Sequence, residues 1–490
     1  MFKKIIGLFS LVLVLLMCSC SDMNGMYKNN MAYDEWCADG EIANEEYNEI
    51  NEKGYSDPKT NPLSSFSLDS SSYAYSNLRR LILNNSYISK DAVVIEQMLN
   101  YFNYSYKNNT DNALSTTIEL APNPFNSANH LALISVNSKA IEMNNTRNNF
   151  VFLIDTSGSM SSENKLGLFQ ESFKLLVNSV DENDTVSIVT YASGVRVIAE
   201  GVSGANKNEL VEMVDELVAS GSTNGSGGIQ KAYELAAKYY IDGGNNRVLL
   251  ATDGDFNVGI TKEGDLNDFI SSKRQTGVYL SVLGFGMYNT KHNKMNTLAE
   301  NGNGNAYYID SLLEAKRVFV EEMGSVLNTV AKDAKIQVEF NPECVERYRL
   351  IGYENKMLTE EEFEDSNTDA GEIGEGHTVI AIYEVTLKEN VKDYILNTKL
   401  RYKDVSTNLD VEVTGSINNV GVMSDDFKFA TAVVEFGLLL RDSAYKGEAT
   451  YEHLINMLES IDLSDDYHKQ EFLQLVKQAQ KKHYVKSIIL

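Results

Sequence analysis

Apolar runs and amphipathic stretches alternate along the chain between residues 148 and 331. Unbroken runs such as FVFLID (150–155) and VYLSVLGFG (278–286) are typical of strands that are buried on both faces. The stretches between the runs carry apolar residues at helical spacing. Because strands and helices alternate, this segment predicts an α/β fold, in which a doubly wound, mostly parallel, Rossmann-like sheet has helices on both faces.

In chain order, the predicted elements of this segment are strand 150–155, helix 165–177, strands 185–192 and 195–200, helices 207–218 and 226–239, strand 247–253, helix 266–273, strand 278–286, helix 291–300, strand 306–310 and helix 312–329. Right-handed crossovers place the loops that follow the parallel strands on one edge of the sheet. Ligands of such folds bind at that edge.

The regions on both sides of the α/β segment are rich in β-strand patterns, mainly over residues 110–140 and 333–420. Isolated short strands do not stabilise themselves, so we expect these two regions to form one β-sandwich with the α/β domain inserted between them. The chain from about residue 425 has helical periodicity. The predicted domains are an N-terminal α+β flanking region (63–147), the α/β domain (148–331), a β-rich domain (332–422) and a C-terminal helical region (423–490).

The first 19 residues have the pattern of an export signal. Two lysines precede an apolar stretch that is too short to cross a bilayer. The sequence LLMCSCSD (15–22) resembles a bacterial lipoprotein signal, which implies cleavage after Ser19 and a diacylglycerol on Cys20. The expected protein is exported, lipid-anchored to the cell membrane or outer membrane, and faces the outside or the periplasm. The alternative is an ordinary signal peptide and a soluble mature product.

Residues 20–62 are polar and acidic and lack apolar periodicity, which predicts a flexible tether. After the signal, Cys37 and Cys344 are the remaining thiols, and they could pair or stay free.

The formal net charge of the chain is −26. Such a chain repels phosphates, so we expect no binding of nucleic acid. The six histidines are scattered, and neither an HExxH nor a GxSxG motif is present. The sequence therefore predicts no enzyme and no small-molecule substrate.

Oxygen-bearing side chains follow the predicted strands at the edge where ligands bind. Asp155, Ser157 and Ser159 follow the first strand, and Asp253 directly follows the strand RVLLAT. A loop rich in glycine and hydroxyl groups, ASGSTNGSGGIQ (219–230), opens a helix. Two carboxylates and several hydroxyls are hard ligands that suit Mg²⁺ or Mn²⁺. Capping of the following turn by Asp155 and the serines would explain one loop but not three that converge.

Asp155-x-Ser157-x-Ser159, Thr223 in its glycine-rich loop and Asp253 in a TDG turn resemble the metal-ion-dependent adhesion site (MIDAS) of von Willebrand factor type A (VWA) domains. The resemblance implies that Ser157, Ser159 and Thr223 contact the metal directly. It implies that Asp155 and Asp253 hold the metal directly or through water. The flanks, including VEFNP and FATAVVEFGLLLRDSAYKG, resemble those of the bacterial YfbK-like proteins.

This resemblance implies a membrane-anchored, metal-dependent binding protein of the adhesion type, which engages an Asp or Glu of a protein partner through the cation. The alternative is an envelope scaffold or chaperone-like assembly factor in which the metal site is regulatory. Related domains shift their last helix when a ligand binds. We therefore expect the helix over 312–329, with Leu313, Val320, Met323 and Leu327 against the sheet, to transmit ligand binding to the β-rich domain that follows.

Overall fold

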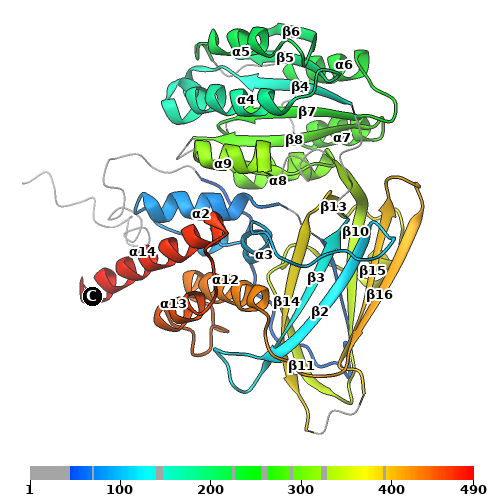
Figure 1. Cartoon of the computed structure of the whole chain (residues 1–490), viewed down its shortest axis with the longest axis vertical. Coiled ribbons are helices and arrows are strands. Elements are labelled where there is room, and N and C mark those ends of the chain that lie inside the picture. The colour runs from blue at the N-terminus through cyan, green and yellow to red at the C-terminus, as the bar shows by residue number, and fades with distance from the viewer. Residues whose placement is uncertain are drawn as a thin grey trace, which may run out of the picture. The chain divides into compact units, whose positions relative to one another are not determined.

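The structure is a computed structural model (Figure 1). It describes residues 45–68, 71–139, 147–222, 227–254, 263–286, 291–321, 328–389 and 393–489. Among the helices within these ranges, none combines the length and apolar character that a membrane crossing requires. The predicted signal, Cys20 and Cys37 lie outside the described residues, whereas Cys344 is buried in the β-rich part of the chain.

The α/β segment forms a sheet with the strand order β6-β5-β4-β7-β8-β9. β6 is antiparallel to β5, and the other neighbouring strands are parallel. The prediction of a mostly parallel α/β sheet is thereby confirmed. The strands are β4 (Asn148–Asp155), β5 (Thr185–Tyr191), β6 (Val195–Ser203), β7 (Asn245–Thr252), β8 (Val278–Phe285) and β9 (Ala306–Ile309).

Helices cover both faces of this sheet, because alternate side chains of each central strand point to opposite sides. In β4, Phe150 and Phe152 belong to one apolar cluster and Val151 and Leu153 to the other. The first cluster includes side chains of α4 (Leu168–Ser179), α5 (Lys207–Asp215) and α9 (Leu312–Lys316). The second includes side chains of α6 (Gly228–Lys238), α7 (Glu263–Arg274) and α8 (His292–Asn301).

The β-rich regions before and after the α/β domain form one sandwich, as predicted. One sheet has the order β12-β1-β10-β15-β16, with β13 also paired to β10, and the other has the order β11-β14-β3-β2. β3 precedes the α/β domain and β14 follows it, and they pair antiparallel from Asn137↔Thr378 onward. The strands are β1 (Leu63–Ser67), β2 (Leu114–Pro122), β3 (His130–Ser138), β10 (Thr329–Phe340), β11 (Val345–Ile351), β12 (Met357–Leu358), β13 (Gly371–Gly374), β14 (Thr378–Leu387), β15 (Leu396–Asp404) and β16 (Asp410–Ile417).

A helical part combines segments from both ends of the described chain. The rings of Phe102, Phe429 and Phe472 lie 4.8–5.6 Å apart within its core. Its helices are α2 (Tyr73–Leu83), α3 (Ile95–Leu99), α12 (Asp425–Arg441), α13 (Tyr451–Glu459) and α14 (Tyr467–Ile489). The C-terminal helices therefore share their core with residues that precede the α/β domain. A short helix, α11 (Glu360–Glu364), begins with a capping box formed by Thr359 and Glu362.

The prediction of a flexible tether up to residue 62 is wrong for residues 45–62. Ile50 is buried, and Glu45 forms a 2.7 Å ion pair with Arg80 of α2. Further along, the amide of Ser56 donates a 2.8 Å hydrogen bond to the carbonyl of Tyr348. The acidic side chains that suggested a solvated tether instead form ion pairs with arginines of the helical part.

The helix predicted over 312–329 is α9 followed by a π-helical turn, η4 (Arg317–Glu321), and residues 322–327 lie outside the described residues. Ala315, Val318 and Phe319 are buried, whereas Val320 is 43% exposed. The predicted packing of Val320 on the sheet is wrong, because a π turn holds one more residue than an α turn and rotates the following side chains. Met323 and Leu327 are not among the described residues.

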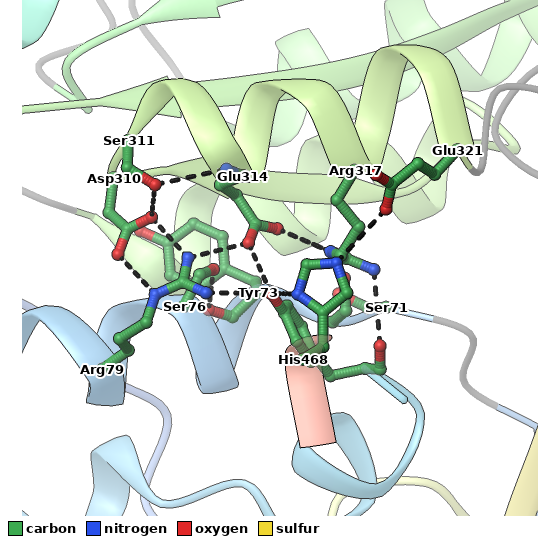
Figure 2. A network of polar contacts seen from close by, with 12 residues as sticks. Ser71, Tyr73, Ser76, Arg79, Asp310, Ser311, Glu314, Arg317, Glu321 and His468 are labelled. Atoms are coloured by element: carbon green, nitrogen blue, oxygen red, sulfur yellow. Dashed lines mark hydrogen bonds and ion pairs between the residues drawn. The ribbon is translucent and has the colours of Figure 1, made fainter. Parts of the chain in front are cut away.

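A buried ionic network joins α9 to the helical part (Figure 2). Arg79 of α2 donates hydrogen bonds to Asp310 (2.5 Å) and Glu314 (2.8 Å), and it also pairs with Glu471 of α14 (2.9 Å). Arg317 donates to Glu314 (2.8 Å) and to the Ser72 hydroxyl (2.8 Å). Burial raises the pKa of Glu314, but Arg317 and Arg79 outweigh that effect and hold it at about 2. The last helix of the α/β domain is thus held by charges of both flanking segments.

Candidate functional site

Two aspartates end neighbouring parallel strands of the α/β sheet. Asp155 is the last residue of β4, and Asp253 follows the last residue of β7. Ile154 is in register with Ala251, so the two carboxylates emerge at the same edge. Asp155 is fully buried and Asp253 is 2% exposed. The structure therefore brings together two of the predicted ligands that lie far apart in sequence.

The loop after β4 folds around the Asp155 carboxylate. The amide of Ser157 donates a 2.8 Å hydrogen bond to Asp155 Oδ1, and a 3₁₀ turn, η2 (Gly158–Ser161), follows. The hydroxyls of Ser157 and Ser159 lie 2.9 Å apart. Ser157 is buried and Ser159 is exposed, so the pair of hydroxyls runs from the base of the site to its rim.

The loop that carries Thr223 begins beside this turn. The amide of Gly158 donates to the carbonyl of Gly221 (3.0 Å), and the amide of Ser220 donates to the carbonyl of Thr156 (2.8 Å). The amide of Ser222 donates to the hydroxyl of Ser193 (3.1 Å). Thr223 itself falls in 223–226, outside the described residues. Its role as a metal ligand stays a prediction, although the residues that precede it are fixed against the Asp155 loop.

One oxygen of the buried Asp155 carboxylate lacks a hydrogen-bond partner among the residues that the structure describes. Oδ2 accepts no hydrogen bond of ordinary length from the described residues. Burial raises the pKa of Asp155 to about 6, and the charge of Asp253 adds to this effect, while the Ser157 amide and the nearby Tyr191 hydroxyl oppose it. Turn capping accounts for Oδ1 but not for Oδ2. A cation would supply the missing partner.

The donor set fits a hard divalent cation. No cluster of three or more His, Cys, Asp or Glu side chains suited to a metal occurs among the described residues. A cation at this edge would therefore rely on serine hydroxyls together with the two carboxylates. Oxygen ligands of this kind, completed by water, suit Mg²⁺ or Mn²⁺. Asp155, Ser157, Ser159 and Asp253 would hold the cation, and the cation would supply an electrophilic position for an outside carboxylate.

Sequence reasoning missed Lys165, which lies in a π-helical turn, η3 (Glu163–Gly167), just before α4. Its ammonium group donates to Asp253 Oδ2 (2.8 Å) and to the carbonyl of Ser159 (2.9 Å). Tyr191, in register with Asp155 on β5 and fully buried, was also missed. No signal in the local sequence distinguished Lys165, which lies six residues after Ser159. For Tyr191, the signal was a tyrosine at the end of a buried strand.

Binding of a cation should depend on pH because only ionised Asp155 can serve as its ligand. Its pKa is raised to about 6, so the protonated fraction grows as the pH falls through 6. We expect the affinity for Mn²⁺ to be constant above about pH 7 and to fall about tenfold for each further pH unit below 6. Calorimetric titrations between about pH 5 and pH 7.5 would measure this. An affinity that is the same at both ends of the range would contradict the assignment of Asp155 as a ligand.

The fold and its loop edge define a von Willebrand factor type A domain protein. The family model described as "von Willebrand factor type A domain" matches residues 149–320, the model described as "von Willebrand factor" matches residues 41–133, and the model described as "Uncharacterized protein YfbK, C-terminal" matches residues 325–482. The chain is 37% identical over 452 residues to the protein of Escherichia coli (strain K12) described as "Uncharacterized protein YfbK", covering 86% of this chain and 78% of that protein. The chain belongs to the YfbK family of VWA-domain proteins.

Solved structures with similarity to the chain include a "von Willebrand factor type A from Catenulispora acidiphila", which is 16% identical, with 74% of this chain and 90% of that chain covered and a TM-score of 0.43. They also include the "ArnB paralog VWA2 from Sulfolobus acidocaldarius", which is 16% identical, with 76% of this chain and 98% of that chain covered and a TM-score of 0.37.

Proposed function

We propose that the chain is a metal-dependent protein-binding protein of the adhesion type, which holds Mg²⁺ or Mn²⁺ with Asp155, Ser157, Ser159, Thr223 and Asp253. The observation that carries the proposal is the buried Asp155 Oδ2, which lacks a hydrogen-bond partner among the described residues, beside two serine hydroxyls. With two carboxylates among its ligands, the cation keeps an affinity for a further acidic group. The partner's Asp or Glu would complete the coordination. Under this proposal the chain binds and does not catalyse.

The test is capture of the partner in the presence and absence of the cation. The full chain is crosslinked in cells, and the captured proteins are identified with Mg²⁺, with EDTA, and after Mg²⁺ is restored. Asp155→Asn should lose the same captured proteins as EDTA. Asp242→Asn is the matched control, because Asp242 is exposed in the turn before β7, at the opposite edge of the sheet. A partner whose capture is unaffected by both EDTA and Asp155→Asn would exclude binding through this site.

A second candidate is an envelope scaffold or chaperone-like assembly factor with a regulatory metal site. The buried network that ties α9 to α2 and α14 favours it, since those flanking helices would sense a change in the α/β domain. The same crosslinking experiment separates the two candidates. Capture of an assembly complex that survives EDTA but changes in composition would favour the scaffold, and loss of a partner would favour adhesion.

We further propose that the chain is exported and anchored through a lipid on Cys20. Two acyl chains give durable membrane attachment where a single chain does not. Cys20→Ser should abolish incorporation of labelled fatty acid and move the protein from the membrane fraction to the soluble fraction. Cys18→Ser is the control and should change neither. Membrane association that persists in Cys20→Ser would rule out an anchor at this position.

A further inference from the structure

Lys165 reaches across the loop edge and joins two of the loops that form the candidate cation site. Its ammonium group lies 2.8 Å from Asp253 Oδ2 and 2.9 Å from the carbonyl oxygen of Ser159. The Lys165 side chain is 12% exposed, and the Asp253 side chain is fully buried. A positive charge of the protein itself is therefore held on a carboxylate that the proposed site assigns to the cation.

The Lys165 side chain passes closely over the backbone of a glycine, Gly286. A Cβ on Gly286, directly after β8, would clash with Lys165 Cε and would lie 2.7 Å from its Cγ. Gly286 also has φ +89°, a conformation that other residues rarely adopt. The lysine stem thus crosses the backbone at a point where a side chain would block it. The π turn that carries Lys165 is a local departure from α-helical geometry, of the kind that often marks functional sites.

We propose that Lys165 is an internal competitor of the divalent cation: its ammonium group and the cation share Asp253, so each weakens the binding of the other. The inference rests on the proposed metal site and deepens it. Two positive charges within a few ångströms of one carboxylate repel each other strongly in a buried, poorly screened site. The ammonium group therefore lowers the affinity for the cation. By reciprocity, a bound cation loosens the ammonium group from Asp253.

Because of this competition, the loops that form the candidate cation site have two alternative sets of contacts. In one, lysine joins the Ser159 carbonyl to Asp253. In the other, the cation joins the serine hydroxyls to the two aspartates, and the ammonium group is released toward solvent. Release would place a second positive charge at the rim of the site, where an acidic partner arrives. The site then binds the cation tightly only when an acidic partner is also present.

Titration of the full chain with Mn²⁺ by calorimetry tests the competition without any partner. Lys165→Met keeps the apolar stem over Gly286 and removes the charge, and it should bind Mn²⁺ about tenfold more tightly than the unsubstituted chain. Lys165→Arg keeps the charge and should bind within about threefold of the unsubstituted chain. Lys174→Met is the matched control on the exposed side of α4, where Lys174 pairs with Glu171 and Asp215, and it should change nothing. Equal or weaker binding by Lys165→Met overturns the proposal.

A second measurement uses the unsubstituted chain and does not depend on the folding of a variant. Acetylation of lysines is followed by peptide mass spectrometry with and without saturating Mg²⁺. Lys165 should react faster when Mg²⁺ is bound, and Lys174 should react at the same rate. Acetylation of Lys165 that Mg²⁺ slows or leaves unchanged overturns the proposal. If no form binds a cation, the metal site fails and the inference fails with it. If Lys165→Met binds Mn²⁺ more tightly but no partner is captured in a metal-dependent way, only the proposed adhesion function is overturned.

Discussion

Arg79→Met should lower the free energy of unfolding by about 3–5 kcal/mol, because it removes the counter-charge of buried Asp310 and one of the two counter-charges of buried Glu314. The Arg79 side chain is 2% exposed and contacts Asp310, Glu314 and Glu471. Methionine fills much of the same volume, so the loss reports on charge rather than on a cavity. Asp310 and Glu314 belong to the α/β domain and Arg79 to the helical part, and the substitution should therefore also loosen α9 from α2.

Urea unfolding of the full chain measures this effect, with Arg401→Met as the matched control. Arg401 pairs with Glu364 and Glu412 on the sandwich surface and is 27% exposed. Its replacement should cost no more than about 1 kcal/mol, as for other surface pairs. Similar losses for the two variants would mean that the buried network does not hold the domains together. Hydrogen exchange in α9 should rise in Arg79→Met alone.

Asp155→Asn should abolish binding of the cation while leaving the fold as stable as before or more stable. Loss of one of two charged ligands should weaken the affinity for Mn²⁺ by about a hundredfold or more. Burial raises the pKa of Asp155 to about 6, so the ionised carboxylate is less stable in the folded chain than in water. Asparagine removes that cost and keeps an oxygen for the Ser157 amide. The free energy of unfolding should stay the same or rise by up to roughly 3 kcal/mol.

Calorimetry and thermal unfolding without a cation separate a ligand from a structural residue. A structural Asp155 would show the opposite pattern, with a lower unfolding temperature and an unchanged response to Mn²⁺. Asp242→Asn again provides the control, since its side chain is exposed and far along the chain from the motif. It should alter neither quantity.

The alternation of apolar strands and amphipathic helices was sufficient to predict the α/β sheet and the loop edge. Apolar runs such as 150–154 have few alternatives to a strand buried on both faces. Parallel connection then forces Asp155 and Asp253 to the same edge. The joint sandwich followed as well, because β2 and β3 needed partners that their own neighbourhood did not offer.

The features that sequence reasoning missed depend on contacts between residues remote along the chain. Residues 45–62 have the composition of a tether, and their docking follows from arginines such as Arg80 and Arg441, placed far along the chain by the fold. Lys165 has no local pattern that distinguishes it from a surface lysine, since its partner Asp253 comes from another strand. The exposure of Val320 depends on a π turn, which leaves no periodic signature in so short a helix.

The pairing of β3 with β14 has a consequence for the order in which the chain acquires its structure during synthesis. β3 and β14 are separated in sequence by the whole α/β domain, so their pairing waits until the chain beyond residue 378 has emerged. The α/β domain is contiguous and can fold earlier, which shortens the loop that the sandwich must close. β2 and β3 remain unpaired with the later strands in the meantime, with exposed edges that can aggregate. If synthesis is interrupted before residue 378, the α/β domain should therefore resist proteolysis, whereas β2 and β3 should be cleaved.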